Sequence, residues 1–75
     1  MAQTTISVIL TQSPTELYKI LKFEGLSSSG AEAKIAIADG LVKVNGVIEL
    51  QKRKKIVDGD VVEFAGTTIN VSCEN

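Results

Sequence analysis

The chain has 75 residues and a formal net charge of −1, with 44% hydrophobic and 23% charged residues. This balance is that of a folded protein and excludes a disordered chain, which needs low hydrophobicity and high net charge. The length fits one domain, so we expect a single domain over residues 1–75. No apolar run reaches the roughly 18 residues of a membrane span, so we expect no membrane partner.

The residue inventory also excludes most catalytic and metal chemistry. The chain has no histidine and one cysteine, Cys73. A structural zinc site needs four Cys or His ligands, a disulfide needs two cysteines, and a Ser–His or Cys–His pair needs a histidine. We therefore expect no catalytic residue, no metal, no cofactor and no enzymatic activity. A lone cysteine without disulfides is typical of the reducing cytosol and predicts a cytoplasmic protein.

The first third of the chain predicts a strand followed by a helix. Residues 4–10 are rich in β-branched side chains, which favour a strand. Residues 13–16 read Ser-Pro-Thr-Glu, the spacing of a capping box with proline at the first helical position, and predict that a helix begins there. This helix is expected to continue over residues 17–23 and to end at Gly25 in the left-handed conformation.

A second helix is predicted next, and strands follow it. Ser29 and Glu32 have capping-box spacing, which predicts a short alanine-rich helix over residues 31–38 that packs closely on the first. After Gly40 the apolar period changes to two. Residues 41–44 and 47–50 then predict a hairpin around Asn45-Gly46, the preferred pair of a type I′ turn.

Two more strands are predicted near the end, over residues 61–64 and 68–72, with Gly66 between them. The order is therefore a strand, two helices and several strands. This pattern predicts an α+β domain in which two packed helices lie against one face of a small, mostly antiparallel β-sheet.

Charge is segregated along the chain in a way that the net value hides. Residues 1–33 hold two bases and three acids, for a net −1. Residues 34–55 hold six bases and two acids, for a net +4, and residues 56–75 hold four acids and no base, for a net −4. Exposed charges farther apart than about 8–10 Å are largely screened, so a polyanion meets the local charge rather than the overall one.

The basic segment is the strongest functional candidate. Four consecutive cations, Lys52 to Lys55, follow the predicted hairpin that carries Lys43, and the helix that carries Lys34 leads into it. We expect these cations to converge into a patch for phosphates, which dominate nucleic-acid affinity. Ser29 and Gly30 open a helix whose backbone amides favour an anion. The alternatives are a solvated loop for the cations and an ordinary helix cap for Ser29.

The aromatic residues are few: Tyr18, Phe23 and Phe64. We predict that all three pack into the core. A platform that stacks single-stranded bases is therefore not expected.

Residues 29–46 read SGAEAKIAIADGLVKVNG and resemble the signature of the ribosomal protein S-four-type RNA-binding domain. That signature, the αL motif, is a pair of packed helices, a glycine and a V-x-V-N-G hairpin. Gly59-Asp60-Val61 fits the closing strand of the family. The resemblance covers about residues 15–64 and extends to the stand-alone bacterial proteins of the YbcJ type. It implies binding to structured RNA of the ribosomal or transfer RNA type, with the ribosome or its associated factors as further partners.

The resemblance also implies a contact surface on the helix pair and the loop beside the hairpin. Its predicted RNA-binding residues are Lys22, Ser29, Gly30, Lys34, Lys43, Lys52, Arg53, Lys54 and Lys55. Two departures from the family concern arginine: many members have it at Gly30, and the stand-alone subgroup often has two arginines and a glycine at residues 51–53. Lysine acts as a point charge where arginine forms a fork, so we expect recognition of RNA shape and phosphate arrangement.

The sequence leaves two other classes of function open. A protein-interaction module would dock an acidic partner, such as a ribosome-associated factor, on the same basic surface. A ubiquitin-like sulfur carrier has a similar length but ends in Gly-Gly, whereas this chain ends Cys73-Glu74-Asn75. Cys73 has no activating base visible in the sequence, so a structural role is expected for it. We expect the protein to be a monomer.

Overall fold

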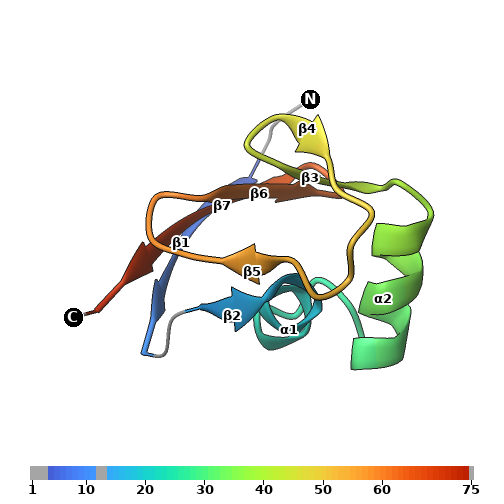
Figure 1. Cartoon of the computed structure of the whole chain (residues 1–75), viewed down its shortest axis with the longest axis horizontal. Coiled ribbons are helices and arrows are strands. Elements are labelled where there is room, and N and C mark those ends of the chain that lie inside the picture. Colours follow the sequence, from blue (N-terminus) through green and yellow to red (C-terminus); the bar gives the residue numbers. More distant parts are fainter. Residues whose placement is uncertain (1–3, 12–13, 75) are drawn as a thin grey trace.

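The computed structural model describes residues 4–11 and 14–74. Its elements in chain order are β1 (Thr4–Leu10), β2 (Thr15–Glu16), α1 (Leu17–Phe23), α2 (Gly30–Ala38), β3 (Val42–Val44), β4 (Val47–Ile48), β5 (Lys55–Ile56), β6 (Val61–Phe64) and β7 (Thr67–Cys73). Five strands form one sheet in the order β1-β7-β6-β3-β4, and β2 pairs with β5 separately (Figure 1). Only β1 and β7 are parallel among the described pairs. The predicted α+β class with a mostly antiparallel sheet is confirmed.

The core lies between the larger sheet and the two helices. Alternate residues of the central strands face inward, as the two-residue period of a strand requires. The helices contribute residues at helical spacing, and the fully buried larger side chains are Leu17, Ile20, Leu21, Ile37, Val42, Ile56, Val62 and Ile69. Ala33 is also fully buried, and its small side chain fits the close packing predicted for the two helices.

The predicted start of the first helix is wrong. Ser13 lies outside the described residues, and Thr15 and Glu16 form strand β2, which pairs in register with Ile56 and Lys55. The helix begins at Leu17, and Glu16 precedes it without a side-chain cap. A strand partner far along the chain therefore outweighs the local capping signal. The predicted stop is confirmed, because Gly25 has a φ of +72°.

The second helix begins within one residue of its predicted start. The Ser29 hydroxyl oxygen accepts a hydrogen bond from the Glu32 amide at 3.2 Å. In a capping box the Glu32 carboxylate would accept a hydrogen bond from the Ser29 amide. Here it accepts a hydrogen bond from the Ser28 hydroxyl instead. The cap thus uses two neighbouring serines in place of one.

Phe23 corrects the prediction that all aromatic residues enter the core. Tyr18 and Phe64 are partly buried and pack against the core, whereas Phe23 is 68% exposed. Phe23 lies two residues after the buried Leu21 on α1. With 3.6 residues per turn, this spacing carries a side chain to the opposite side of a helix.

Asn45 joins the β3–β4 turn to the start of β6. Asn45 and Gly46 have φ values of +53° and +83°, as the predicted type I′ turn requires. The Asn45 carboxamide donates to Asp60 Oδ1 at 3.1 Å and accepts from the Val61 amide at 2.9 Å. The second Asp60 oxygen accepts from the Val57 amide at 2.9 Å. One side chain therefore holds the hairpin against the glycine-aspartate turn.

Replacing Asn45 is expected to destabilise the domain. Asn45→Ala removes both side-chain hydrogen bonds and puts alanine, which tolerates positive φ less well than asparagine, in the turn. The free energy of unfolding should therefore fall by about 1–3 kcal/mol. Asn45→Gly keeps the turn conformation but loses the same hydrogen bonds, so its free energy of unfolding should fall by less than that of Asn45→Ala. Urea denaturation of both variants measures the difference. Wild-type stability in Asn45→Ala would show that these bonds contribute nothing.

Candidate functional site

The basic loop, residues 52–55, is held against the first turn of α1. The Tyr18 amide donates to the Lys52 carbonyl at 3.2 Å, and the Leu17 amide donates to the Lys54 carbonyl at 3.0 Å. Lys55 pairs with Glu16 in the β2–β5 ladder. The backbone of the four cations is therefore fixed at three points, two on α1 and one on β2, while their side chains remain exposed or half-buried.

Tyr18 brings cations of both helices together. The Lys34 ammonium of α2 lies 4.6 Å from the centroid of the Tyr18 ring, and the Lys19 ammonium lies 6.0 Å from it. Both distances are within the range of cation–π attraction. A β-carbon built at Gly30 would lie 3.6 Å from Tyr18 Cε2 and 4.0 Å from Lys22 Cδ. The ring is thus a common neighbour of Lys19, Lys34 and the start of α2, and Lys22 lies close to the same helix start.

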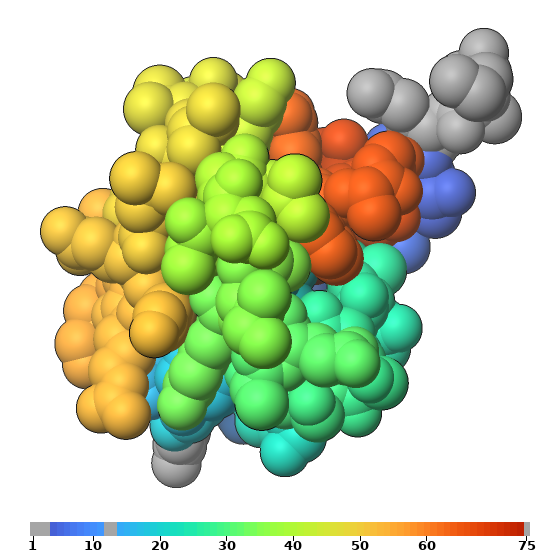
Figure 2. Space-filling model, turned by 90° about the vertical axis from the view of Figure 1, so that its right-hand side faces the viewer, coloured from blue at the N-terminus to red at the C-terminus, as the bar shows by residue number. Residues whose placement is uncertain are grey.

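Seven cations belong to the two helices and the loop that meet at Tyr18. We call them the basic surface: Lys19, Lys22, Lys34, Lys52, Arg53, Lys54 and Lys55. Figure 2 shows the loop on one side of α2, in yellow and orange. Ser29 and Gly30 lie at the start of α2 beside it. Tyr18 and Lys19 are not among the site residues predicted from the sequence. The spacing of three residues between Lys19 and Lys22 on one helix was a signal that could have identified Lys19.

Lys43 is not brought together with the other cations. Val42 and Val44 are buried on the helix side of the sheet, so Lys43 between them faces the other side. Its register partner in β6 is Glu63. The predicted convergence therefore does not extend to Lys43, because the two-residue period of its strand turns the side chain away from the helices.

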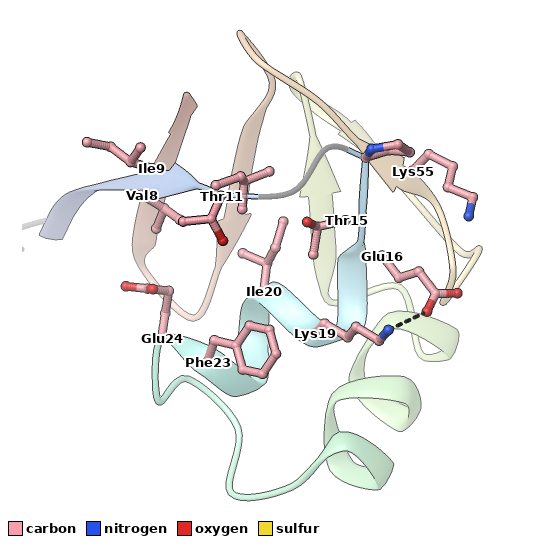
Figure 3. Close-up of a pocket in the computed structure, with 12 residues that line it drawn as sticks. Val8, Ile9, Thr11, Thr15, Glu16, Lys19, Ile20, Phe23, Glu24 and Lys55 are labelled. Atoms are coloured by element: carbon pink, nitrogen blue, oxygen red, sulfur yellow. Dashed lines mark ion pairs between the residues drawn. The ribbon is translucent and has the colours of Figure 1, made fainter. Parts of the chain in front are cut away.

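Glu16 is an acid within the basic surface. It forms ion pairs with Lys19 at 3.2 Å and with Arg53 at 3.8 Å, and Figure 3 shows the first of these. The hydrogen bond from Lys19 lowers the pKa of Glu16, and the charges of Lys19, Arg53 and Lys55 act in the same direction, against partial burial. Ionised Glu16 thereby orients Lys19 and Arg53 at the loop.

A groove of about 480 Å³ borders this surface between the end of β1 and α1 (Figure 3). Lys19 and Lys55 line it together with Ile20, Phe23 and Glu24. Its side chains are a mixture of charged and apolar groups. Within residues 4–11 and 14–74, no three acidic, cysteine or histidine side chains are placed to hold a metal ion. The same part of the chain contains no helix long and apolar enough to cross a membrane.

Comparison with known proteins gives a consistent result. The S4 domain family matches residues 8–72. The chain is 59% identical over 56 residues to YbcJ of Escherichia coli (strain K12), named as a candidate RNA-binding protein, and equally to YbcJ of Shigella flexneri; each match covers 75% of this chain and 80% of the relative.

A solved structure also matches. The solution structure of E. coli YbcJ, described as revealing an αL motif involved in RNA binding, has 49% sequence identity and a TM-score of 0.65. The match covers 96% of this chain and 90% of that one. Together these findings confirm the resemblance that the sequence carries.

The ion pairs of Glu16 predict a specific pH dependence. Because the folded-state pKa is lowered, the stabilisation is present above the unfolded pKa of about 4.3 and is lost as the pH falls through the folded value. The free energy of unfolding of wild type should therefore exceed that of Glu16→Gln at pH 7, and the difference should shrink as the pH falls below about 4.3. Urea denaturation across this range measures it. A difference that is constant with pH would contradict the assignment.

Proposed function

Because the chain belongs to the S4 domain family, we propose that it binds structured RNA through the basic surface around Tyr18. The observation that carries this proposal is the attachment of the basic loop to α1 beside the cations of both helices. Contacts to phosphates dominate nucleic-acid affinity, so a surface with many cations attracts the phosphate backbone of a folded RNA. The names of the matched relatives support the same ligand class.

The geometry favours recognition of RNA shape over recognition of base sequence. Six of the seven cations are lysines, which act as point charges, and Arg53 is engaged with Glu16. A-form RNA also hides its base edges in a deep, narrow major groove and exposes phosphates and 2′-hydroxyls. Ser29 and Gly30 add a helix N-terminus beside Lys22 and Lys34. We expect ribosomal or transfer RNA to be the target class.

The protein is proposed to act by binding alone. Glu16, which lies among the cations of the basic surface, is paired with two of them. The sequence also contains no histidine, the most common general acid or base, which supports a role in binding without catalysis. We place this activity in the cytoplasm, with the protein as a monomer and the ribosome or its associated factors as further partners.

Removing cations from the basic surface should weaken RNA binding. We expect Lys34→Ala, and Lys54→Ala with Lys55→Ala, to reduce affinity by about threefold to tenfold per lysine and to lower the salt slope by about 0.7–0.9 per lost phosphate contact. Lys43→Ala is the matched control, since Lys43 faces the other side of the sheet, and should change affinity little. Fluorescence anisotropy with a ribosomal RNA fragment, transfer RNA and duplex DNA across a salt series measures these effects.

The outcomes of this experiment separate the proposed function from its alternative. Equal losses for Lys43→Ala and Lys34→Ala would show that only overall charge matters and would exclude the proposed site. Failure of the wild-type protein to bind any of the three nucleic acids at low salt would favour an acidic protein as the partner. Capture of such a partner that survives nuclease treatment would then establish the interaction module.

Restoring the family arginine at Gly30 should strengthen binding. Gly30 is the first residue of α2, and a β-carbon there meets only ordinary contacts with Tyr18 and Lys22. Gly30→Arg should therefore fold and, by adding a fork for phosphate oxygens, raise RNA affinity about threefold to tenfold. Gly30→Ala controls for the backbone change and should leave affinity near that of wild type. Anisotropy titration that shows no gain for the arginine variant would contradict a phosphate site at this position.

A further inference from the structure

The helix α2 presents two chemically different sides. Glu32, Ile35 and Asp39 have the spacing i, i+3 and i+7, which places them along one face of a helix. Lys34 lies on the flank that contacts Tyr18. Figure 2 shows α2 in green between the yellow and orange basic loop on one side and the β6–β7 turn with the α1–α2 loop on the other.

A groove of about 420 Å³ lies on the side of α2 away from the basic loop. The side chains that matter in it are Leu26, Glu32, Ile35, Asp39, Leu41 and Phe64. Ile35 is 61% exposed and Leu41 is 60% exposed, although both are large and apolar. No lysine or arginine lines this groove within the described part of the chain.

The groove therefore combines an exposed apolar floor with negative charge. Neighbouring exposed apolar side chains mark interaction sites more often than scattered ones do. The two acids oppose a phosphate backbone and attract a cation, so the local charge selects against RNA and in favour of a basic chain. Both acids are exposed and neither forms an ion pair among the described residues.

We propose that this groove docks a basic peptide segment of a protein partner. An apolar side chain of the segment covers Ile35 and Leu41, and lysine or arginine side chains on either side of it meet Glu32 and Asp39. The basic surface and the groove lie on different sides of α2, so RNA and the peptide bind at the same time. This inference stands on its own residues and does not depend on RNA binding.

The test uses the full chain and defined synthetic peptides. The probe is a capped 12-residue peptide with two leucines four positions apart and lysine, arginine and alanine elsewhere. One control peptide has serine for both leucines, and another has glutamate for every lysine and arginine. Heteronuclear NMR titration should show binding of the probe alone, with the largest amide shifts at Ile35, Asp39 and Leu41.

Two protein variants locate the contact. Leu41→Ser should weaken probe binding about tenfold, because the apolar side chain that the bound probe covers is then absent. Glu32→Gln with Asp39→Asn should weaken it about threefold to thirtyfold, since two exposed ion pairs are lost. Val47→Ser is the matched control, because Val47 is 69% exposed but does not line the groove, and it should bind the probe as wild type does.

The remaining outcomes overturn the inference. Equal binding of the probe and the serine peptide would reduce the effect to charge alone, and binding of the glutamate peptide would exclude the acidic rim. Probe shifts elsewhere, or none at millimolar peptide, would exclude the groove. A dimer in light scattering that Leu41→Ser dissociates would identify a second copy as the occupant. RNA affinity should stay unchanged in Leu41→Ser, which removes no charge, and this keeps the result separate from the test of RNA binding.

Discussion

The basic surface depends on the backbone hydrogen bonds between the first turn of α1 and the basic loop. The first amides of a helix have no partner within the helix and need acceptors from elsewhere. In α1, the carbonyls of Lys52 and Lys54 supply two of them, in place of a side-chain cap. The same bonds hold the backbone of four adjacent cations in place against the mutual repulsion of their charges. One set of contacts therefore satisfies the helix end and shapes the loop.

This attachment also explains the position of Tyr18. Its amide is bonded to the loop, and its ring is directed to α2, where Lys34 and the start of the helix contact it. The ring is thus a fixed point between three segments that each carry cations. Binding to a preformed surface loses less conformational entropy than binding that must first order a loop. A lysine-rich surface gains most from this, because each exposed contact contributes little alone.

Local signals in the sequence predicted much of the fold. Strand β1 has its predicted bounds, the turn at Asn45 and Gly46 has its predicted type, and Ser29 caps α2 as expected. Each of these depends on neighbours within a few residues. The start of α1 was predicted wrongly because its true determinant is the pairing of β2 with β5, which no local pattern reveals.

The candidate site shows the same limit. Placing Lys34 near the basic loop needed only the expected packing of two helices, but separating Lys43 from it needed the face of β3. The alternation of valine and lysine over residues 42–44 already carried that information, since buried valines on both sides leave the lysine outward. Proximity along the chain therefore predicts the position of Lys43 less well than the two-residue period of its strand does.

The position of the acids explains why the net charge of the chain is a poor guide to its ligand. Asp58 accepts a hydrogen bond from the Cys73 amide of β7 at 2.9 Å, and Asp60 accepts hydrogen bonds from the Val57 amide and the Asn45 side chain. Both carboxylates of the turn before β6 are therefore hydrogen-bonded. Glu63 lies in β6 opposite Lys43, on the side of the sheet away from the helices. Three of the four acids of residues 56–75 thus lie in the sheet or in the turn before β6. The cations around Tyr18 lie on the two helices and the basic loop, and they present a local positive field from a chain whose total charge is −1.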